Sequence, residues 1–268
     1  MRVMETRPLS KTTVRGPREG FPPPAADWCL FLDIDGTLLE HRDRPDDVVV
    51  DAALRTLLGR LAESLDGAVA LISGRSIEDV DGLFAPLSVP VAGLHGVEHR
   101  DVDGVVHRHD LDEGALGSAR AHLEQVAAQN PGLFFEDKGL SLALHYRTAP
   151  QLAPTAEAAI RAVARDLGIR FEIQQGKMVW ELKPSGYDKG TAIDEYLAEA
   201  PFLGRTPVFL GDDLTDEVGF DLVNRHGGHS IKIGAGRTRA SWRLADARAV
   251  RAFLAALAEF LAARPRGD

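Results

Sequence analysis

The chain has 268 residues, of which 44% are hydrophobic and 26% charged, a composition typical of a soluble protein that buries a full core. Its formal net charge of −9 and the absence of any basic block argue against nucleic acid as a partner. No apolar run approaches the ~20 residues of a membrane span, and the single cysteine, Cys29, excludes an intrachain disulfide and suits a reducing compartment. We therefore expect a cytoplasmic protein of enzyme size without a membrane partner, and a monomer is the simplest expectation.

The first 26 residues differ from the rest in composition. They carry basic residues and the run Pro22-Pro23-Pro24, but they lack the apolar segment of a signal peptide. We predict a disordered leader over residues 1–26.

Short aliphatic runs, each followed by a helix-like pattern, make up most of the remaining chain. Apolar runs of strand length cover residues 28–32, 68–72 and 207–210, and helix-like patterns cover residues 50–64, 77–84 and 216–223. The runs are continuous rather than alternating, which favours strands of a parallel sheet that is buried on both faces. We predict an α/β fold with an open, Rossmann-like parallel sheet, whose binding sites gather at the carboxyl ends of the strands.

The middle of the chain has a different order of elements. Asp103-Gly104 lies between β-prone residues and predicts a hairpin turn. Helix-like patterns at 111–129 and 156–167 are each followed by two strand candidates, at 133–136, 140–146, 170–174 and 178–182. This order predicts an α+β domain at 108–183 inserted into a core made of 27–107 and 184–268. The apolar stripe of the last helix, from Val250 to Leu261, should pack on the core sheet rather than bind a partner.

Polar side chains come directly after three of the predicted strands. Asp33 and Asp35 come after the first, Ser73-Gly74-Arg75 after the second, and the run from Gly211 to Glu217 after the third. In a parallel sheet these strand ends lie at one edge, and two like charges at about 4 Å repel by roughly 4 kcal/mol at an effective dielectric near 20. The cluster therefore needs a cation or protons. Oxygen ligands without cysteine or paired histidine favour Mg²⁺ over zinc; the alternative is that the aspartates cap turns and helices.

Asp33-Ile34-Asp35-Gly36-Thr37 resembles the first motif of the haloacid-dehalogenase-like phosphohydrolases, and Ser73, Lys189 and residues 211–217 match the later motifs in order. The resemblance implies that Asp33 attacks phosphorus and forms an aspartyl-phosphate. It implies that Asp35 acts as general acid and then as general base. The insertion between Ser73 and Lys189 has the position of the larger, C2-type cap of this superfamily.

The same resemblance assigns the remaining roles in the core. Ser73 would hold a phosphoryl oxygen, and Lys189 would neutralise the nucleophile and the phosphate. Mg²⁺ would be held by the carboxylates of Asp33 and Asp212 and the carbonyl of Asp35, with Asp213 and Asp216 orienting them. Thr37, Gly74 and Arg75 are further candidates for substrate contacts. Lys183 competes with Lys189; we favour Lys189 because it opens a helix beside a glycine, and we expect Lys183 to be a solvated charge.

Several longer strings resemble the trehalose-6-phosphate phosphatase family. They lie at residues 93–98, 138–141, 144–147, 181–184 and 211–217, and the similarity extends from about residue 28 to 262. The candidates for gripping sugar hydroxyls in the cap are Lys138, His145, Arg147 and Glu181. For each of them, the alternative is a surface salt bridge or a satisfied polar group on a strand.

The resemblance implies Mg²⁺-dependent hydrolysis of trehalose 6-phosphate to trehalose and phosphate, in trehalose biosynthesis. Another sugar phosphatase of the same cap type, acting on sucrose phosphate or a mannosyl phosphoglycerate, remains an alternative. A third is a sugar-phosphate-binding module without turnover. The presence of both Asp33 and Asp35 weighs against that module, because a pure binder has no need of an acid–base residue.

Overall fold

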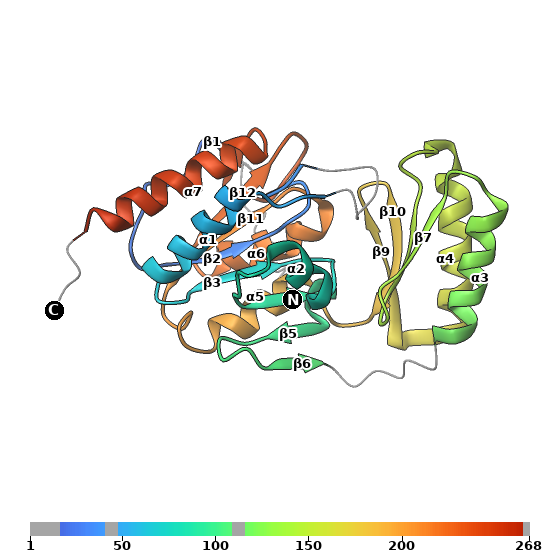
Figure 1. Ribbon diagram of the computed structural model, residues 1–268. Coiled ribbons are helices and arrows are strands. Elements are labelled where there is room, and N and C mark those ends of the chain that lie inside the picture. The colour runs from blue at the N-terminus through green and yellow to red at the C-terminus, as the bar shows by residue number, and fades with distance from the viewer. Residues whose placement is uncertain (1–16, 41–47, 109–115, 265–268) are drawn as a thin grey trace, which may run out of the picture.

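The computed structural model describes residues 17–40, 48–108 and 116–264. Its described part contains two β-sheets, one of nine strands and one of four, and each is covered by helices (Figure 1). None of the described helices has the length and apolar character needed to cross a membrane.

The nine-stranded sheet carries the strand ends that the sequence singled out. In spatial order its strands are β1 (Arg18–Glu19), β13 (Trp242–Leu244), β12 (His229–Ile233), β11 (Thr206–Gly211), β2 (Trp28–Leu32), β3 (Val69–Ile72), β4 (Val91–Gly93), β5 (Glu98–Arg100) and β6 (Val106–Arg108). All neighbours from β1 to β4 are parallel, and β5 and β6 add an antiparallel hairpin. β2, β3 and β11 are buried along nearly their whole length. The predicted parallel sheet is therefore confirmed.

Within the described residues, the helices that cover this sheet are α1 (Ala52–Ser64), α2 (Ile77–Phe84), α5 (Lys189–Leu197), α6 (Glu217–Arg225) and α7 (Ala247–Ala262). α1 packs against α7, and α5 packs against α6. The crossover through α1 leads from β2 to β3 and that through α6 leads from β11 to β12, in opposite directions across the sheet. Because such crossovers are right-handed, the two helices lie on opposite faces. Figure 1 shows α1 and α7 above the sheet and α5 below it.

The four-stranded sheet has a hydrophobic core of its own. Its antiparallel strands, in order, are β7 (Phe134–Asp137), β8 (Leu142–His145), β10 (Val179–Pro184) and β9 (Phe171–Gly176). Helices α3 (Gly117–Gln129) and α4 (Ala153–Leu167) cover the face that points away from the large sheet (Figure 1). Leu123, Leu142, Ile160 and Leu182 are fully buried between these layers. The other face of the small sheet is turned toward the large domain.

The predicted elements and the observed ones agree closely. The strand at 28–32 and the helix at 77–84 have the predicted bounds, and Ser76 caps the helix by accepting from the backbone of Asp79. The hairpin at Asp103-Gly104 is confirmed between β5 and β6, with Gly104 at φ 81°. The start of the helix predicted at 111–129 lies outside the described residues, and α3 begins at Gly117. The stripe of α7 is buried on the core from Val250 to Leu257, as expected, but Phe260 near its end is exposed.

The predicted disordered leader is too long. Residues 1–16 lie outside the described residues, but Arg18–Glu19 forms β1 and pairs with β13. The backbone N–H of Arg18 donates to the carbonyl of Ser241 at 3.0 Å, and the ring of Phe21 lies 4.8 Å from that of Phe253. These contacts hold part of the predicted leader, from Arg18 to Phe21, against the core domain. We propose that the core domain comprises residues 27–107 and 184–268, with the cap at 108–183.

Candidate active site

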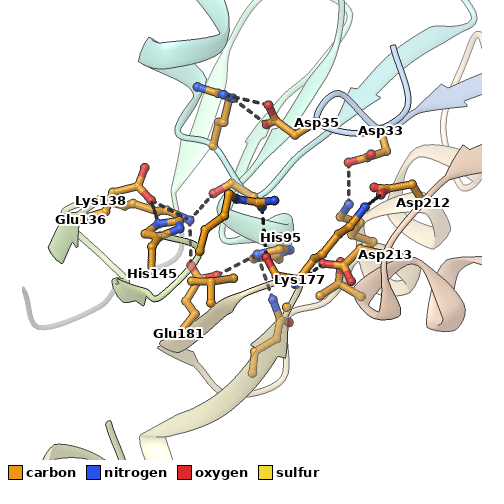
Figure 2. Close-up of a pocket in the computed structure, with 18 of the residues that line it drawn as sticks. Asp33, Asp35, His95, Glu136, Lys138, His145, Lys177, Glu181, Asp212 and Asp213 are labelled. Atoms are coloured by element: carbon orange, nitrogen blue, oxygen red, sulfur yellow. Dashed lines mark hydrogen bonds and ion pairs between the residues drawn. The ribbon is translucent and has the colours of Figure 1, made fainter. Parts of the chain in front are cut away.

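The polar residues at the ends of β2, β3 and β11 meet at one edge of the large sheet. These three strands are adjacent and parallel, so Asp33, Ser73 and Asp212 come after strands that end side by side. The small sheet faces this edge, and one pocket is lined by residues of both domains. Figure 2 shows Asp33, Asp35 and Asp212 on the core side of the pocket and Lys138, His145 and Glu181 on the cap side.

Three carboxylates, from Asp33, Asp212 and Asp216, form what we call the acidic floor of the site. Each offers an oxygen, and these oxygens lie within 4.8 Å of one another. Lys189 Nζ donates to Asp33 Oδ1 and to Asp216 Oδ1, both at 2.7 Å. The lysine and these two aspartates are buried. One buried ammonium thus bridges two of the three carboxylates, and Lys177 Nζ lies 3.5 Å from Oδ2 of the third, Asp212.

The burial of the acidic floor changes the ionisation of its groups. Burial raises the pKa of Asp33 well above its usual range, and the nearby charges of Asp212 and Asp216 add to this effect, against the pull of Lys189. Burial opposes the charge of Lys189 too, but the carboxylates of Asp216 and Asp33 hold its pKa above the usual range. The lysine therefore stays charged, and a bound cation would relieve the burial and crowding that raise the pKa of Asp33.

The donor atoms of the acidic floor fit Mg²⁺. Asp33 Oδ2 is buried and has no hydrogen-bond partner among the described residues. Both oxygens of Asp216 are engaged, one by Lys189 and the other by the backbone N–H of Asp213 at 2.8 Å. This agrees with an orienting role for Asp216, and Asp33 and Asp212, with the carbonyl of Asp35, are the groups that would hold the ion. All are hard oxygen donors of the kind that Mg²⁺ prefers.

The two competing lysines have different surroundings. Lys189 begins α5, where Asp188 and Thr191 form a capping box, and its side chain enters the acidic floor. The expectation that Lys183 is solvated is wrong: it is 1% exposed. Its Nζ contacts Glu172 Oε1 at 2.7 Å and donates to the carbonyl of Tyr187. Lys183 therefore has partners of its own, which supports the choice of Lys189.

Asp35 lies beside the floor and is held by an arginine. Arg75 Nε donates to Asp35 Oδ2 at 2.7 Å, and Arg75 Nη2 donates to Asp35 Oδ1 at 2.8 Å. Burial opposes the charge of Arg75, but the Asp35 carboxylate holds the pKa of the guanidinium above its usual range. Both residues line the pocket, as does Gly74. The predicted contact of Arg75 with the substrate stays a prediction.

Two predicted residues lie behind the pocket wall. Ser73 is buried, and its hydroxyl accepts from the backbone N–H of Arg75 at 3.1 Å. The hydroxyl of Thr37 is also buried, with no hydrogen-bond partner among the described residues. Both sit at the strand ends that flank the acidic floor, and their contacts with a phosphoryl group remain predictions.

The opposite side of the pocket, which we call the cap wall, consists of Glu136, Lys138, His145 and Glu181. Lys138 Nζ donates to Glu181 Oε1 at 3.2 Å and, across the domain boundary, to the carbonyl of Gly74 at 3.0 Å. His145 Nε2 lies 2.7 Å from Glu136 Oε2. Although burial opposes ionisation, Lys138 and His95 hold the pKa of Glu181 below its usual range. Each carboxylate of the cap wall therefore has a hydrogen-bond partner, Lys138 for Glu181 and His145 for Glu136.

The fourth predicted cap residue, Arg147, also lines the pocket. Its Nη2 donates to the carbonyl of Lys177 at 3.1 Å. All four residues predicted to contact the sugar thus lie around one pocket.

The pocket residues that sequence reasoning missed include four polar side chains: His95, Glu136, Gln174 and Lys177. His95 Nε2 lies 3.1 Å from Glu181 Oε2 and 2.9 Å from the side-chain nitrogen of Gln174, so it joins the core to the cap. Lys177 Nζ lies 3.5 Å from Asp212 Oδ2. Glu136 ends the strand predicted at 133–136 and lies two positions before the candidate Lys138, so its place near the site could have been inferred. His95 lies within the string at 93–98, but its position there does not reveal its role.

Comparison with known proteins gives a consistent result. The chain matches the trehalose-phosphatase family over residues 31–248. It is 46% identical to the trehalose-6-phosphate phosphatase of Escherichia coli (strain K12), covering 90% of this chain and 86% of that protein. A probable trehalose-phosphate phosphatase of Sinorhizobium fredii is 42% identical, with 87% and 88% covered.

A solved structure supports the same assignment. The crystal structure of a trehalose-6-phosphate phosphatase related protein superposes with a TM-score of 0.73 at 30% identity, covering 87% of this chain and 97% of that one. The resemblance found in the sequence is confirmed. The chain belongs to the trehalose-phosphatase family of phosphoric monoester hydrolases, with a haloacid-dehalogenase-like core and a cap.

Proposed function

We propose that this chain is a Mg²⁺-dependent phosphatase that hydrolyses trehalose 6-phosphate to trehalose and phosphate, as a step of trehalose biosynthesis. The observation that carries the proposal is a single pocket with the acidic floor on one side and the cap wall on the other. The high identity to proteins named for this substrate supports the choice of sugar.

In the first step, a carboxylate oxygen of Asp33 attacks phosphorus. The bond between phosphorus and the sugar oxygen breaks, and Asp35 gives its proton to that oxygen, so trehalose leaves as a neutral alcohol. Asp33 then carries the phosphoryl group as an acyl phosphate. Lys189, 2.7 Å from Asp33 Oδ1, holds the nucleophile and stabilises charge on the phosphoryl oxygens.

In the second step, Asp35 acts as a base. It takes a proton from water, whose oxygen attacks phosphorus, and the bond from phosphorus to Asp33 breaks. Inorganic phosphate is released and the Asp33 carboxylate is restored. Ser73 is proposed to hold a phosphoryl oxygen, and Thr37 and Gly74 are the further proposed contacts of the core with the substrate. When bound, Mg²⁺ would supply positive charge that keeps Asp33 ionised and stabilises the phosphoryl oxygens.

The cap wall suits a neutral disaccharide. A sugar offers many hydroxyl groups and no charge beyond its phosphate, so a wall of hydrogen-bonding side chains suits it. Lys138, His145, Arg147 and Glu181 are the proposed contacts. Closure of the cap over the sugar would exclude water from the acidic floor. We further propose that the protein acts in the cytoplasm as a monomer, without nucleic-acid or membrane partners.

A substrate panel tests this proposal. Phosphate release is measured from trehalose 6-phosphate, sucrose 6-phosphate, glucose 6-phosphate and p-nitrophenyl phosphate, with Mg²⁺ and with chelator. We expect kcat/KM to be highest for trehalose 6-phosphate and activity to be lost with chelator. The Asp33→Asn variant is the negative control. A kcat/KM for trehalose 6-phosphate no better than for glucose 6-phosphate would remove the proposed substrate, and tight binding without release would favour a binding module.

A further inference from the structure

Asp35 is engaged by one side chain on both of its oxygens. Arg75 Nε reaches Asp35 Oδ2 at 2.7 Å and Arg75 Nη2 reaches Asp35 Oδ1 at 2.8 Å, drawn as dashed lines from Asp35 in Figure 2. The side chains of Arg75 and Asp35 are 11% and 33% exposed. A planar guanidinium that binds both oxygens fixes the distance to a carboxylate and also the plane in which it lies.

The backbone that carries Arg75 is held firmly by the core. Its N–H donates to Ser73 Oγ at 3.1 Å, and its carbonyl accepts from the N–H of Leu94 at 2.8 Å. A Cβ on Gly93 would lie 3.0 Å from the Arg75 carbonyl oxygen, so the two backbones approach closely. Asp35 lies in a turn that is also hydrogen-bonded, with the N–H of Gly36 donating to the carbonyl of Leu39 at 2.7 Å. Both backbones are therefore held, and the guanidinium sets the orientation of the Asp35 carboxyl group between them.

We propose that Arg75 is the positioning residue of Asp35: its guanidinium holds the carboxyl group where it can pass a proton to the leaving sugar oxygen and later take one from water. A carboxylate has about four lone-pair sites, so a bidentate arginine leaves two of them open to the pocket. This inference rests on the proposed function, because it takes the acid–base role of Asp35 from there. It differs from the sequence prediction, in which Arg75 contacts the substrate directly.

Substrates with different leaving groups can distinguish an Arg75 that positions Asp35 from an Arg75 that contacts the substrate directly. The oxygen of a sugar ester needs a proton as it departs, whereas p-nitrophenolate is stable as an anion and needs none. We measure single-turnover rates with enzyme in excess, so that formation of the phosphorylated enzyme is observed alone. We expect Arg75→Met to slow trehalose release by about 100-fold and p-nitrophenol release by less than about threefold. Arg75→Lys, which cannot bind both oxygens, should fall between wild type and Arg75→Met.

A double-mutant cycle tests whether Arg75 acts through Asp35. Asp35→Asn alone should slow trehalose release by about 10² to 10⁴-fold. Adding Arg75→Met to it should then have little further effect, because the group that the arginine positions is gone. If Arg75 instead binds the phosphate or the sugar directly, its effect persists in the Asp35→Asn background and is equal for the two leaving groups. Either of these results overturns the inference.

Arg100 provides a matched control for loss of a partly buried arginine. It is 8% exposed and binds both oxygens of Asp81, at 2.7 and 2.8 Å, but lies outside the pocket. Arg100→Met should lower the melting temperature and leave the ratio of the two leaving-group rates unchanged. A changed ratio would trace the Arg75 effect to stability and overturn the inference.

A wild-type rate for Asp35→Asn with trehalose 6-phosphate would remove the acid role of Asp35 from the proposed function, and this inference with it. If Asp35→Asn is slow but the effect of Arg75→Met persists in its background, the inference fails and the proposed function stands.

Discussion

The acidic floor and the cap wall face each other across one pocket, but their carboxylates differ in how fully they are hydrogen-bonded. In the floor, Lys189 pairs with Asp33 and Asp216, and Asp33 Oδ2 has no hydrogen-bond partner among the described residues. In the cap wall, Glu136 is hydrogen-bonded to His145, and Glu181 to Lys138. A buried carboxylate oxygen without a partner costs free energy unless a ligand relieves it, whereas a hydrogen-bonded network is stable alone. We therefore propose that the cation and the phosphate bind at the floor and the neutral sugar at the wall.

The largest effect is expected from removing the lysine of the floor. Lys189→Ala should lower kcat by about 10³-fold or more, because a positive charge is lost beside the reacting group. Lys183→Ala is the matched control: it removes a buried lysine that contacts Glu172 and Tyr187, and it should lower stability while turnover continues. Loss of turnover in Lys183→Ala, with Lys189→Ala active, would reverse the assignment.

A smaller and more selective effect is expected in the cap wall. Lys138→Met leaves Glu181 buried without its ammonium partner, which should lower the free energy of unfolding by about 3 to 5 kcal/mol. It should lower kcat/KM for trehalose 6-phosphate by about 10 to 100-fold through lost sugar contacts, and change hydrolysis of p-nitrophenyl phosphate little. Arg161→Met, on the outer helix α4, is the control that should spare both substrates. Equal losses of kcat/KM for both substrates would contradict the proposal that the acidic floor binds the phosphate and the cap wall binds the sugar.

Metal binding should stabilise the folded protein through the floor. At a Mg²⁺ concentration 100 times the Kd, a single site adds about 2.7 kcal/mol, or a rise of about 5 to 10 °C in the melting temperature. Asp212→Asn should abolish the rise, and chelator should reverse it in wild type. The melting temperature is measured by thermal unfolding with and without Mg²⁺. A melting temperature insensitive to Mg²⁺ in wild type argues against the site.

The smallest effect concerns pH and the contact between the domains. Burial lowers the pKa of His95, although Glu181 pulls in the other direction. His95 therefore binds a proton more readily in the unfolded chain than in the folded protein. The free energy of unfolding should fall as the pH falls through about 6.5. Burial lowers the pKa of His229 as well, with the same sign, so the comparison with His95→Gln isolates His95. A pH dependence identical in wild type and His95→Gln contradicts this assignment.

Local sequence pattern predicted which strand ends meet, but it holds no information on the register between strands. Asp33, Ser73 and Asp212 were placed together because the ends of adjacent parallel strands share an edge. The burial of Lys183 was missed because its partner, Glu172, lies opposite it across β9 and β10, in a register that only the folded sheet reveals. β1 was missed because two residues carry no periodicity. The Arg75–Asp35 pair joins residues 40 positions apart, and only side-chain geometry reveals it.

The most direct test of the account is to capture the phosphoryl group on the floor. Asp35→Asn should still release p-nitrophenol in a first turnover and then stall, because water lacks its base. Borohydride reduces an aspartyl-phosphate to homoserine, and peptide mass spectrometry locates the change. The account predicts a burst of p-nitrophenol and a homoserine in place of Asp33. A burst with Asp33 unmodified, or a modification at Asp212 or Asp216 instead, would contradict it.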